Sequence, residues 1–425
     1  MQVALRYGRG TLEMSVPDGG QTQILRMNVV AALADPASAL TDLLANPMGT
    51  APLVELARNR RDAVIVISDI TRPFPNRLVL PVLLDTLAAA GLPNDRVTIL
   101  IATGLHRPNE GAELEEMVGA EIVRRCRVVN HVARNDEEQV HVGTTSLGVE
   151  ALIDRTYVEA DLKILTGLIE PHLMAGYSGG RKLVCPGLAS WRTIKEFHSP
   201  KLLEHPRATA GVLEGNPVHQ TSLEIARMVG VDFIVNATLD EPRNITGLFA
   251  GELEMAHRAG VERVNEMVRA TLLEPADIVV TCSAGYPLDA TFYQSIKGLV
   301  GALPAVKQGG SLIMAASLTE GLGSPEFSDL IQSMESVDSY MARLLSPDYF
   351  QIDQWQAEEL LKVLRQAEVT CVTDGLPAEV LSRCLVTPEA SLSQALDRAL
   401  LRHGPDARIC VIPEGPYVMP IVAGS

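Results

Sequence analysis

The sequence predicts an α/β protein of two domains, each built around a largely parallel sheet. Two observations carry this prediction. Short apolar runs rich in β-branched residues alternate with helical patterns along most of the chain, which is typical of parallel sheets covered by helices. The chain also has 425 residues, more than a single hydrophobic core usually supports.

We expect the first domain to span residues 1–274. Its strands are predicted from apolar runs bounded by polar or glycine residues. Those runs cover residues 63–68, 97–102, 162–166 and 233–237. A helical pattern from 76 to 91 ends in a glycine, which suits the position just after a helix. A second, longer helical pattern runs from 253 to 273.

The second domain is expected to span residues 275–425, because the α/β rhythm restarts after Glu274 and Pro275. Strands are predicted at 276–283, 311–315, 369–373 and 408–412, and helices at 291–307, within 324–367 and at 391–403. The extreme C-terminus is free to pack back on the first domain.

Composition limits the partners. A formal net charge of −16 repels phosphate backbones and argues against nucleic acid. The N-terminus lacks the pattern of a signal peptide, and no run of ~20 apolar residues is long enough to span a bilayer. Six widely and irregularly spaced cysteines fit reduced thiols better than a disulfide framework. We therefore expect a soluble cytoplasmic protein without membrane partners, a monomer or a homodimer.

Polar loops follow three of the predicted strands. They cover residues 68–73 (SDITRP), 103–107 (TGLHR) and 167–172 (GLIEPH). Ligands of open α/β sheets bind at the carboxyl ends of strands. The three loops are therefore predicted to converge on one site.

Histidines and a glycine-rich segment supply the candidate chemistry. His106 and His172 lie in the polar loops, and His198 follows a short helical pattern. Histidine serves acid–base catalysis near neutral pH and binds metals, although each of these residues alone could be structural. No HExxH or close His/Cys set appears, which argues against an ordinary zinc site. Residues 176–182 (GYSGGRK) either form a tight turn before a helix or cradle an anion next to Lys182.

The remaining candidates have equally open interpretations. Asp69 and Arg72 share one loop. They either form a local turn with an ion pair or bind the hydroxyl and anionic groups of a ligand. Gln294 and Lys297 share one face of a predicted helix, either exposed to solvent or facing a ligand. Trp355 is one of two tryptophans and either packs a helix or lines a site.

Taken in order, these segments resemble the lactate racemase family that uses the nickel-pincer nucleotide. The matching stretches are 68–73, 103–107, 170–172, 176–182, 197–198, 215–219, 294–297 and Trp355. Each is weak alone, and the ordered set is specific. The resemblance implies two α/β domains with the active site in the interdomain cleft, and cofactor maturation proteins as partners.

The resemblance also implies a role for each position. Lys182 would carry the cofactor, a nickel-containing pyridinium-3-thioamide-5-thiocarboxylic acid mononucleotide, and His198 would bind Ni(II). His106 and His172 would be the paired acid/base residues. Four residues would contact the substrate: Arg72, Lys297, Gln294 and Trp355. Four more would bind the nucleotide: Asp69, Ser178, Gly179 and Gly180.

The implied activity is racemisation or epimerisation of a lactate-like 2-hydroxyacid by hydride transfer through a 2-keto acid. Two alternatives remain open from the residues. One is a metal-dependent hydrolase or lyase with histidine-bound zinc, and the other is a non-catalytic nickel or nucleotide carrier. The acidic chain would still need local cations to hold an anionic substrate, which Arg72 and Lys297 would provide.

Overall fold

A computed structural model describes residues 1–346 and 349–423, and it divides the chain into two compact units. One unit is continuous, from Val30 to Met267. The other combines Met1–Val29 with Val268–Ser425. The predicted two-domain α/β class is confirmed, but the predicted first domain, 1–274, is not one unit. Its first 29 residues belong with Val268–Ser425, and we call this combined unit the C-terminal unit.

The reason for this difference is strand pairing at long range. β3 (Thr22–Ile24) joins the edge of the C-terminal sheet beside β19 (Ile409–Ile412). A preceding hairpin of β1 (Gln2–Tyr7) and β2 (Gly10–Ser15) packs its apolar face into the same core. No local pattern in the first residues reveals a partner almost 390 residues away.

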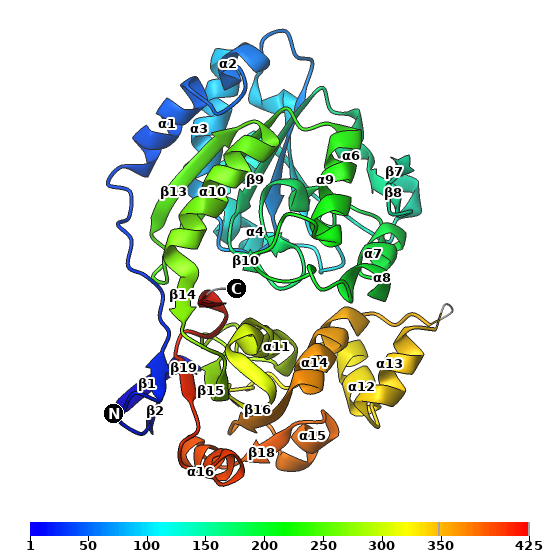
Figure 1. The fold of residues 1–425 in the computed structure, drawn as a ribbon. Helices are drawn as coiled ribbons and strands as arrows, with labels where there is room; N and C mark the ends of the chain where they lie inside the picture. Colours follow the sequence, from blue (N-terminus) through cyan, green and yellow to red (C-terminus); the bar gives the residue numbers. More distant parts are fainter. Residues whose placement is uncertain (347–348, 424–425) are drawn as a thin grey trace. The chain divides into compact units, whose positions relative to one another are not determined.

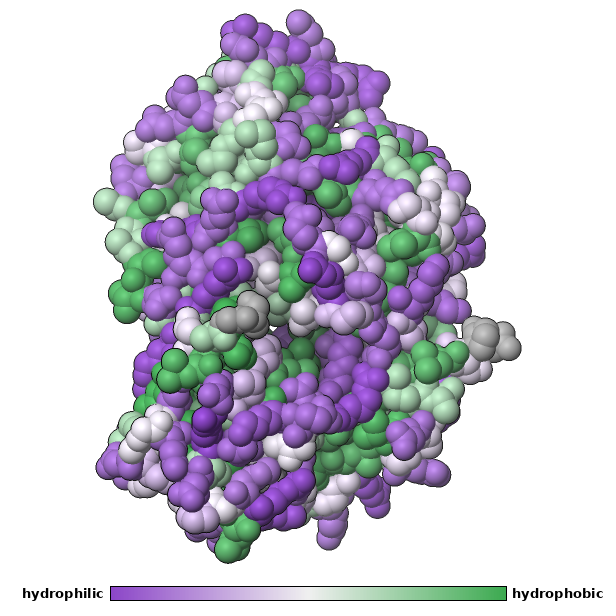
Figure 2. Space-filling view, in the orientation of Figure 1, coloured by the Kyte–Doolittle hydropathy of each residue, from purple (hydrophilic) through white to green (hydrophobic). Residues whose placement is uncertain are grey.

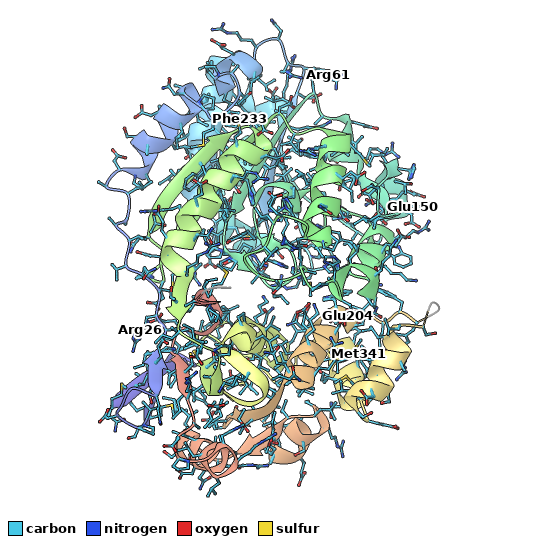
Figure 3. The ribbon with its side chains drawn as sticks, in the orientation of Figure 1. Arg26, Arg61, Glu150, Glu204, Phe233 and Met341 are labelled. Carbon is cyan, nitrogen blue, oxygen red and sulfur yellow. The ribbon has the colours of Figure 1, made fainter. Side chains whose placement is uncertain are left out.

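The Val30–Met267 unit is built on a six-stranded sheet with the order β13-β12-β9-β4-β5-β6, of which Figure 1 labels β9 and β13. The strands are β4 (Ala63–Ser68), β5 (Val97–Ala102), β6 (Arg127–Asn130), β9 (Leu162–Leu168), β12 (Phe233–Leu239) and β13 (Ile245–Gly251). All neighbours are parallel except β12 and β13. Phe233, labelled in Figure 3, is fully buried at the start of β12.

Helices cover both faces of parallel sheets because both faces are apolar. Every residue of β4 is buried. The helix α3 (Asn76–Ala89) packs four leucines and one valine into the core that contains β4 side chains. The other helices of the unit are α1 (Pro36–Ala45), α2 (Leu53–Leu56), α4 (Gly111–Val118), α5 (Ala120–Arg125), α6 (Arg155–Glu159), α7 (Trp191–Phe197), α8 (Pro200–Leu203), α9 (Pro217–Val229) and α10 (Leu253–Val268). A small antiparallel pair, β7 (Gln139–Thr144) and β8 (Glu150–Asp154), completes it.

The other unit contains an entirely parallel sheet with the order β18-β17-β16-β15-β19-β3. Its remaining strands are β15 (Ala276–Cys282), β16 (Val306–Ala315), β17 (Ala367–Val372) and β18 (Thr387–Glu389). Its helices are α11 (Phe292–Ala302), α12 (Pro325–Gln332), α13 (Val337–Leu344), α14 (Gln354–Gln366), α15 (Ala378–Arg383) and α16 (Leu392–His403).

One predicted helix is too long. The pattern at 253–273 forms a helix only to Val268, and β14 (Arg269–Leu272) then pairs in parallel with β20 (Met419–Val422). The extreme C-terminus therefore packs on β14, within the C-terminal unit. Tertiary pairing overrides a weak local helical preference here.

The surface and the cysteines agree with the composition. Figure 2 shows hydrophilic and hydrophobic residues interspersed over the visible face. None of the described helices is both long and apolar enough to cross a bilayer. All six cysteines are free and buried.

Candidate active site

The carboxyl ends of β9, β4 and β5 lie side by side in the sheet. β4 pairs with β9 on one side and with β5 on the other, all in parallel. In this register Ser68 stands opposite Ala102. The loops that begin at Asp69, Thr103 and Ile169 therefore leave the same edge of the sheet, as the sequence predicted.

Asp69 and His106 form a hydrogen-bonded pair across two of these loops. Asp69 Oδ2 lies 2.6 Å from His106 Nδ1, and Thr71 Oγ1 donates to Asp69 Oδ1 at 2.6 Å. Burial raises the pKa of Asp69, but the hydrogen bond and charge of His106, with Thr71 and Arg72, outweigh burial and lower it. An ionised Asp69 accepts the Nδ1 proton, so the lone pair of neutral His106 is on Nε2.

His106 is the more accessible partner of this pair. Its side chain is 60% exposed, whereas that of Asp69 is 7% exposed. The carboxylate is thus held behind the ring, and the opposite ring nitrogen is directed outward. This is the arrangement that orients a histidine as a general base.

Arg72 is held by a residue that the sequence did not single out. Its Nε lies 3.2 Å from Glu170 Oε1, and both side chains are about one-third exposed, at 28% and 32%. Glu170 lies two residues before His172 in the loop that follows β9. A signal was present, since Glu170 belongs to the Glu-Pro-His segment, but the pattern did not indicate what the carboxylate contacts.

His172 has a different environment from His106. It lies in β10 (Pro171–His172), which pairs with β11 (Gly176–Tyr177). The backbone amides of Met174 and Ala175 both donate to His172 Nδ1, at 3.2 Å each. Because Nδ1 accepts, the proton of the neutral ring lies on Nε2.

Two glycines of the segment 176–182 are required by geometry. Gly176 and Gly179 both have φ of +77°, which residues with a Cβ rarely adopt. A Cβ on Gly176 would lie 2.2 Å from Val212 O, and one on Gly179 would lie 2.4 Å from Asn236 Oδ1. The segment is therefore a tight turn packed from both sides.

The predicted nucleotide contacts in this segment are engaged within the protein. Ser178 Oγ donates to Leu168 O at 2.8 Å and accepts from the Glu170 amide at 3.0 Å. The Gly180 amide donates to Asn236 Oδ1 at 3.0 Å. These bonds shape the turn that leads into Lys182.

Lys182 and His198 lie close together in the same unit. Lys182 is in the short 3-10 helix Gly180–Leu183, and His198 caps the C-terminus of α7. Burial and the charge of Lys182 lower the pKa of His198 to about 3. His198 Nδ1 donates to Ile194 O at 3.1 Å, so the lone pair of the neutral ring is on Nε2.

Three predicted substrate residues belong to the C-terminal unit. Gln294 and Lys297 are on α11, and Trp355 is on α14. The Trp355 indole donates to the Tyr293 hydroxyl at 3.2 Å, and Gln356 donates to the Tyr293 carbonyl at 2.8 Å. Tyr293 thus ties the two helices together, and Gln294 Oε1 is buried without a hydrogen-bond partner among the described residues.

Comparison with known proteins identifies the family. The model for the lactate racemase N-terminal domain matches residues 7–211, and that for the lactate racemase C-terminal domain matches residues 272–420. Lactate racemase of Thermoanaerobacterium thermosaccharolyticum is 36% identical over 421 residues, which are 98% of each chain. Lactate racemase of Lactiplantibacillus plantarum is 36% identical over 88% of each chain.

Solved structures show the same relationship. The lactate racemase apoprotein of T. thermosaccharolyticum matches with a TM-score of 0.92 over 99% of this chain and 100% of that chain. A Thermotoga maritima protein shares the fold, with a TM-score of 0.70 at 19% identity over 93% of this chain and 100% of its own. These matches, together with both domain models, show that the chain belongs to the lactate racemase family and is an isomerase of the racemase type.

Proposed function

We propose that this racemase interconverts the enantiomers of a small 2-hydroxyacid such as lactate, by removing and returning hydride at C2 through a 2-keto acid. One observation carries the proposal. His106, hydrogen-bonded to Asp69 at 2.6 Å, lies in a loop that leaves the same sheet edge as the loops that contain His172 and Arg72. Both curated relatives are named lactate racemase, which supports lactate as the first substrate to test.

The reaction favours hydride removal over proton removal at C2. The carboxylate is already charged, so abstraction of the C2 proton would place a second negative charge on the same small ion. Hydride loss instead leaves a neutral ketone. The alcohol proton must then leave as well, and a base within ~3 Å of the hydroxyl can take it.

His106 and His172 would divide the proton transfers. His106 accepts at Nε2, because its Nδ1 proton is committed to Asp69. His172 donates from Nε2, because its Nδ1 accepts from two backbone amides. One enantiomer would therefore lose its hydroxyl proton to His106. The other would need His172 in the opposite tautomer: its proton would move from Nε2 to Nδ1, with release of the two amide contacts, before Nε2 could accept the hydroxyl proton.

Membership of the lactate racemase family implies a nickel-dependent cofactor. The residues fit the nickel-pincer nucleotide: Lys182 would form the covalent link, and His198 would offer its Nε2 to Ni(II). When bound, this group supplies the hydride acceptor. Its attachment would require dedicated maturation proteins.

The cofactor and substrate contacts are assigned as follows. We propose that Asp69 acts mainly on His106, and that Ser178, Gly179 and Gly180 shape the turn beside the nucleotide. Arg72, oriented by Glu170, would pair with the substrate carboxylate. Lys297, Gln294 and Trp355 would contribute the remaining substrate contacts from α11 and α14.

A histidine-bound zinc hydrolase or lyase has less support. Among residues 1–346 and 349–423, no three His, Cys, Asp or Glu side chains gather in a way that could hold a metal ion. A catalytic zinc site usually needs three protein ligands. A pure carrier would have no use for the Asp69–His106 pair.

The proposal is tested with holo-protein and enantiopure 2-hydroxyacids. Intact mass should show one adduct on Lys182 with stoichiometric nickel, and either lactate enantiomer should convert to the other. His106→Ala and His172→Ala should keep the adduct and lose the conversion. Zinc without an adduct would support the hydrolase or lyase instead, and an adduct without turnover on any hydroxyacid would support the carrier.

A further inference from the structure

Arg181, the residue before Lys182, is buried in an unusual way. Only 1% of it is exposed. Its Nη2 donates to Ala175 O at 2.9 Å and to Tyr177 O at 2.8 Å, and its Nη1 lies 3.5 Å from Gly179 O. One guanidinium thus reaches carbonyl groups along the whole turn that precedes it.

His257 closes the other side of the guanidinium. It lies on α10, is 3% exposed, and its Nε2 is 2.8 Å from Arg181 Nη1 and 2.8 Å from Ser178 O. Burial lowers the pKa of Arg181 to about 9, so the guanidinium is still charged at neutral pH. Burial and that charge hold the pKa of His257 well below its usual value. The neutral ring can either accept from Arg181 or donate to Ser178 O through this nitrogen, depending on its tautomer, and both contacts hold it against the turn.

Asn236 fixes the turn from the sheet. It lies on β12, three residues after the Phe233 labelled in Figure 3, and it is fully buried. Its Oδ1 accepts from the Gly180 amide at 3.0 Å and is the atom that a Cβ on Gly179 would strike. The turn is thus bound to α10 through its carbonyls and to β12 through an amide.

Burying a charged side chain such as that of Arg181 costs free energy of folding. A buried charge needs compensation, and no carboxylate of the described residues forms a salt bridge with Arg181. Its compensation comes from backbone carbonyls of one short segment. Arginine can serve several of these acceptors at once because its donors are fixed in a plane, which a lysine ammonium cannot reproduce.

We infer that Arg181 is a positioning residue which, with His257 and Asn236, locks residues 175–180 so that the Lys182 amine points in one direction. The inference rests on the proposed role of Lys182 as the attachment point. Without the cluster the chain would still fold, but the lysine would sample many directions and would meet its cofactor less often.

The test uses the apoprotein, so it does not depend on racemisation. A short pulse of N-acetoxysuccinimide at neutral pH acetylates exposed amines, and peptide mass spectrometry compares Lys182 with Lys201 in each sample. The variants are Arg181→Met, Arg181→Lys and His257→Gln. The matched control is Arg60→Met, which removes a partly buried arginine of the same unit bonded to Asp161 and Asp232.

The expected result is faster acetylation of Lys182 in Arg181→Met, by roughly threefold or more, because a loosened turn exposes the lysine more often. Arg181→Lys and His257→Gln should lie between it and the wild type. Arg60→Met should lower the melting temperature without changing the ratio. The inference would be overturned if Arg181→Lys and His257→Gln kept the wild-type ratio of Lys182 to Lys201 acetylation while their melting temperatures fell as much as that of Arg60→Met. If Lys182 carried no adduct in mature wild-type protein, the proposed function would fail separately from the positioning.

Discussion

Asp69 Oδ2 lies 2.6 Å from His106 Nδ1 at the carboxyl edge of the sheet in the Val30–Met267 unit, with the carboxylate buried and the ring exposed. A second Asp–His pair, Asp154 and His131, is buried in the same unit, with an Oδ2–Nδ1 distance of 2.8 Å. In that pair, however, the other ring nitrogen contacts the Ala189 carbonyl, 3.0 Å away. The His106 ring is 60% exposed, whereas the His131 ring is fully buried and contacts a protein oxygen at each nitrogen.

Asp69→Asn should therefore reduce turnover selectively. The amide can hold the ring in the wrong tautomer, and loss of the orienting carboxylate should lower kcat by about 10²- to 10⁴-fold. Kinetics on enantiopure lactate and the intact mass of the Lys182 adduct check this. Asp154→Asn is the matched control, which should reduce stability and leave kcat of the folded fraction nearly unchanged. Equal losses of kcat in both variants would contradict the catalytic role of Asp69.

Arg72→Ala should raise the KM for lactate. A charge-assisted hydrogen bond contributes about 1.5–3 kcal/mol, which corresponds to roughly a 10- to 100-fold change in binding. The comparison is with Arg107→Ala, since Arg107 pairs with Glu113 at 2.6 and 2.8 Å on an exposed surface near the same edge. Initial rates at varied lactate concentration measure both. A normal KM in Arg72→Ala would remove Arg72 from substrate binding.

Gly179→Ala should destabilise the Val30–Met267 unit more than Gly230→Ala does. Both glycines combine positive φ, +77° and +80°, with extended ψ, so both substitutions add strain of about 1–3 kcal/mol. The Gly230 position has open space, whereas a Cβ on Gly179 would lie 2.4 Å from Asn236 Oδ1. Chemical unfolding compares the two. Equal losses of stability would show that the turn can yield.

His219 should make the protein less stable in acid. Burial, with the charges of Arg181, Arg258 and Arg227, lowers its pKa to about 3. The unfolded chain then binds a proton below about pH 6.5 that the folded protein does not, so stability falls as the pH drops from 6.5 towards 3.

His219→Leu removes this effect. Between pH 7.5 and 5.5 the variant should lose about 1.4 kcal/mol less unfolding free energy than its parent. Trp191 lies in the same unit as His219, so a Trp355→Phe background leaves one fluorescent reporter in that unit. Identical pH dependence in the two proteins would contradict a neutral, buried His219.

The sequence predicted the parts of the site that local patterns determine. β4 and β5 were predictable because each is a short, mostly apolar run rich in β-branched residues. The polar loops after them followed from the rule that parallel strands present their carboxyl ends together. The places of His106 after β5, His172 after β9 and Lys182 in the segment 176–182 needed no tertiary information.

The missing parts depend on contacts between distant segments. The ion pair of Arg72 with Glu170 joins two loops, and the Arg181–His257 contact joins a turn to a helix 76 residues later. No motif in the sequence singles out His257, and only the structure reveals which turn it contacts. In the same way, β3 pairs with β19 across nearly the whole chain, and no local pattern predicts such pairing.

The most direct test of the central claim is chiral analysis of lactate incubated with holo-protein, started separately from each pure enantiomer. The account predicts that both reactions approach an equal mixture of the two enantiomers, and that neither does so with His106→Ala protein carrying the same adduct and nickel. Fully loaded wild-type protein that leaves both enantiomers unchanged would contradict it.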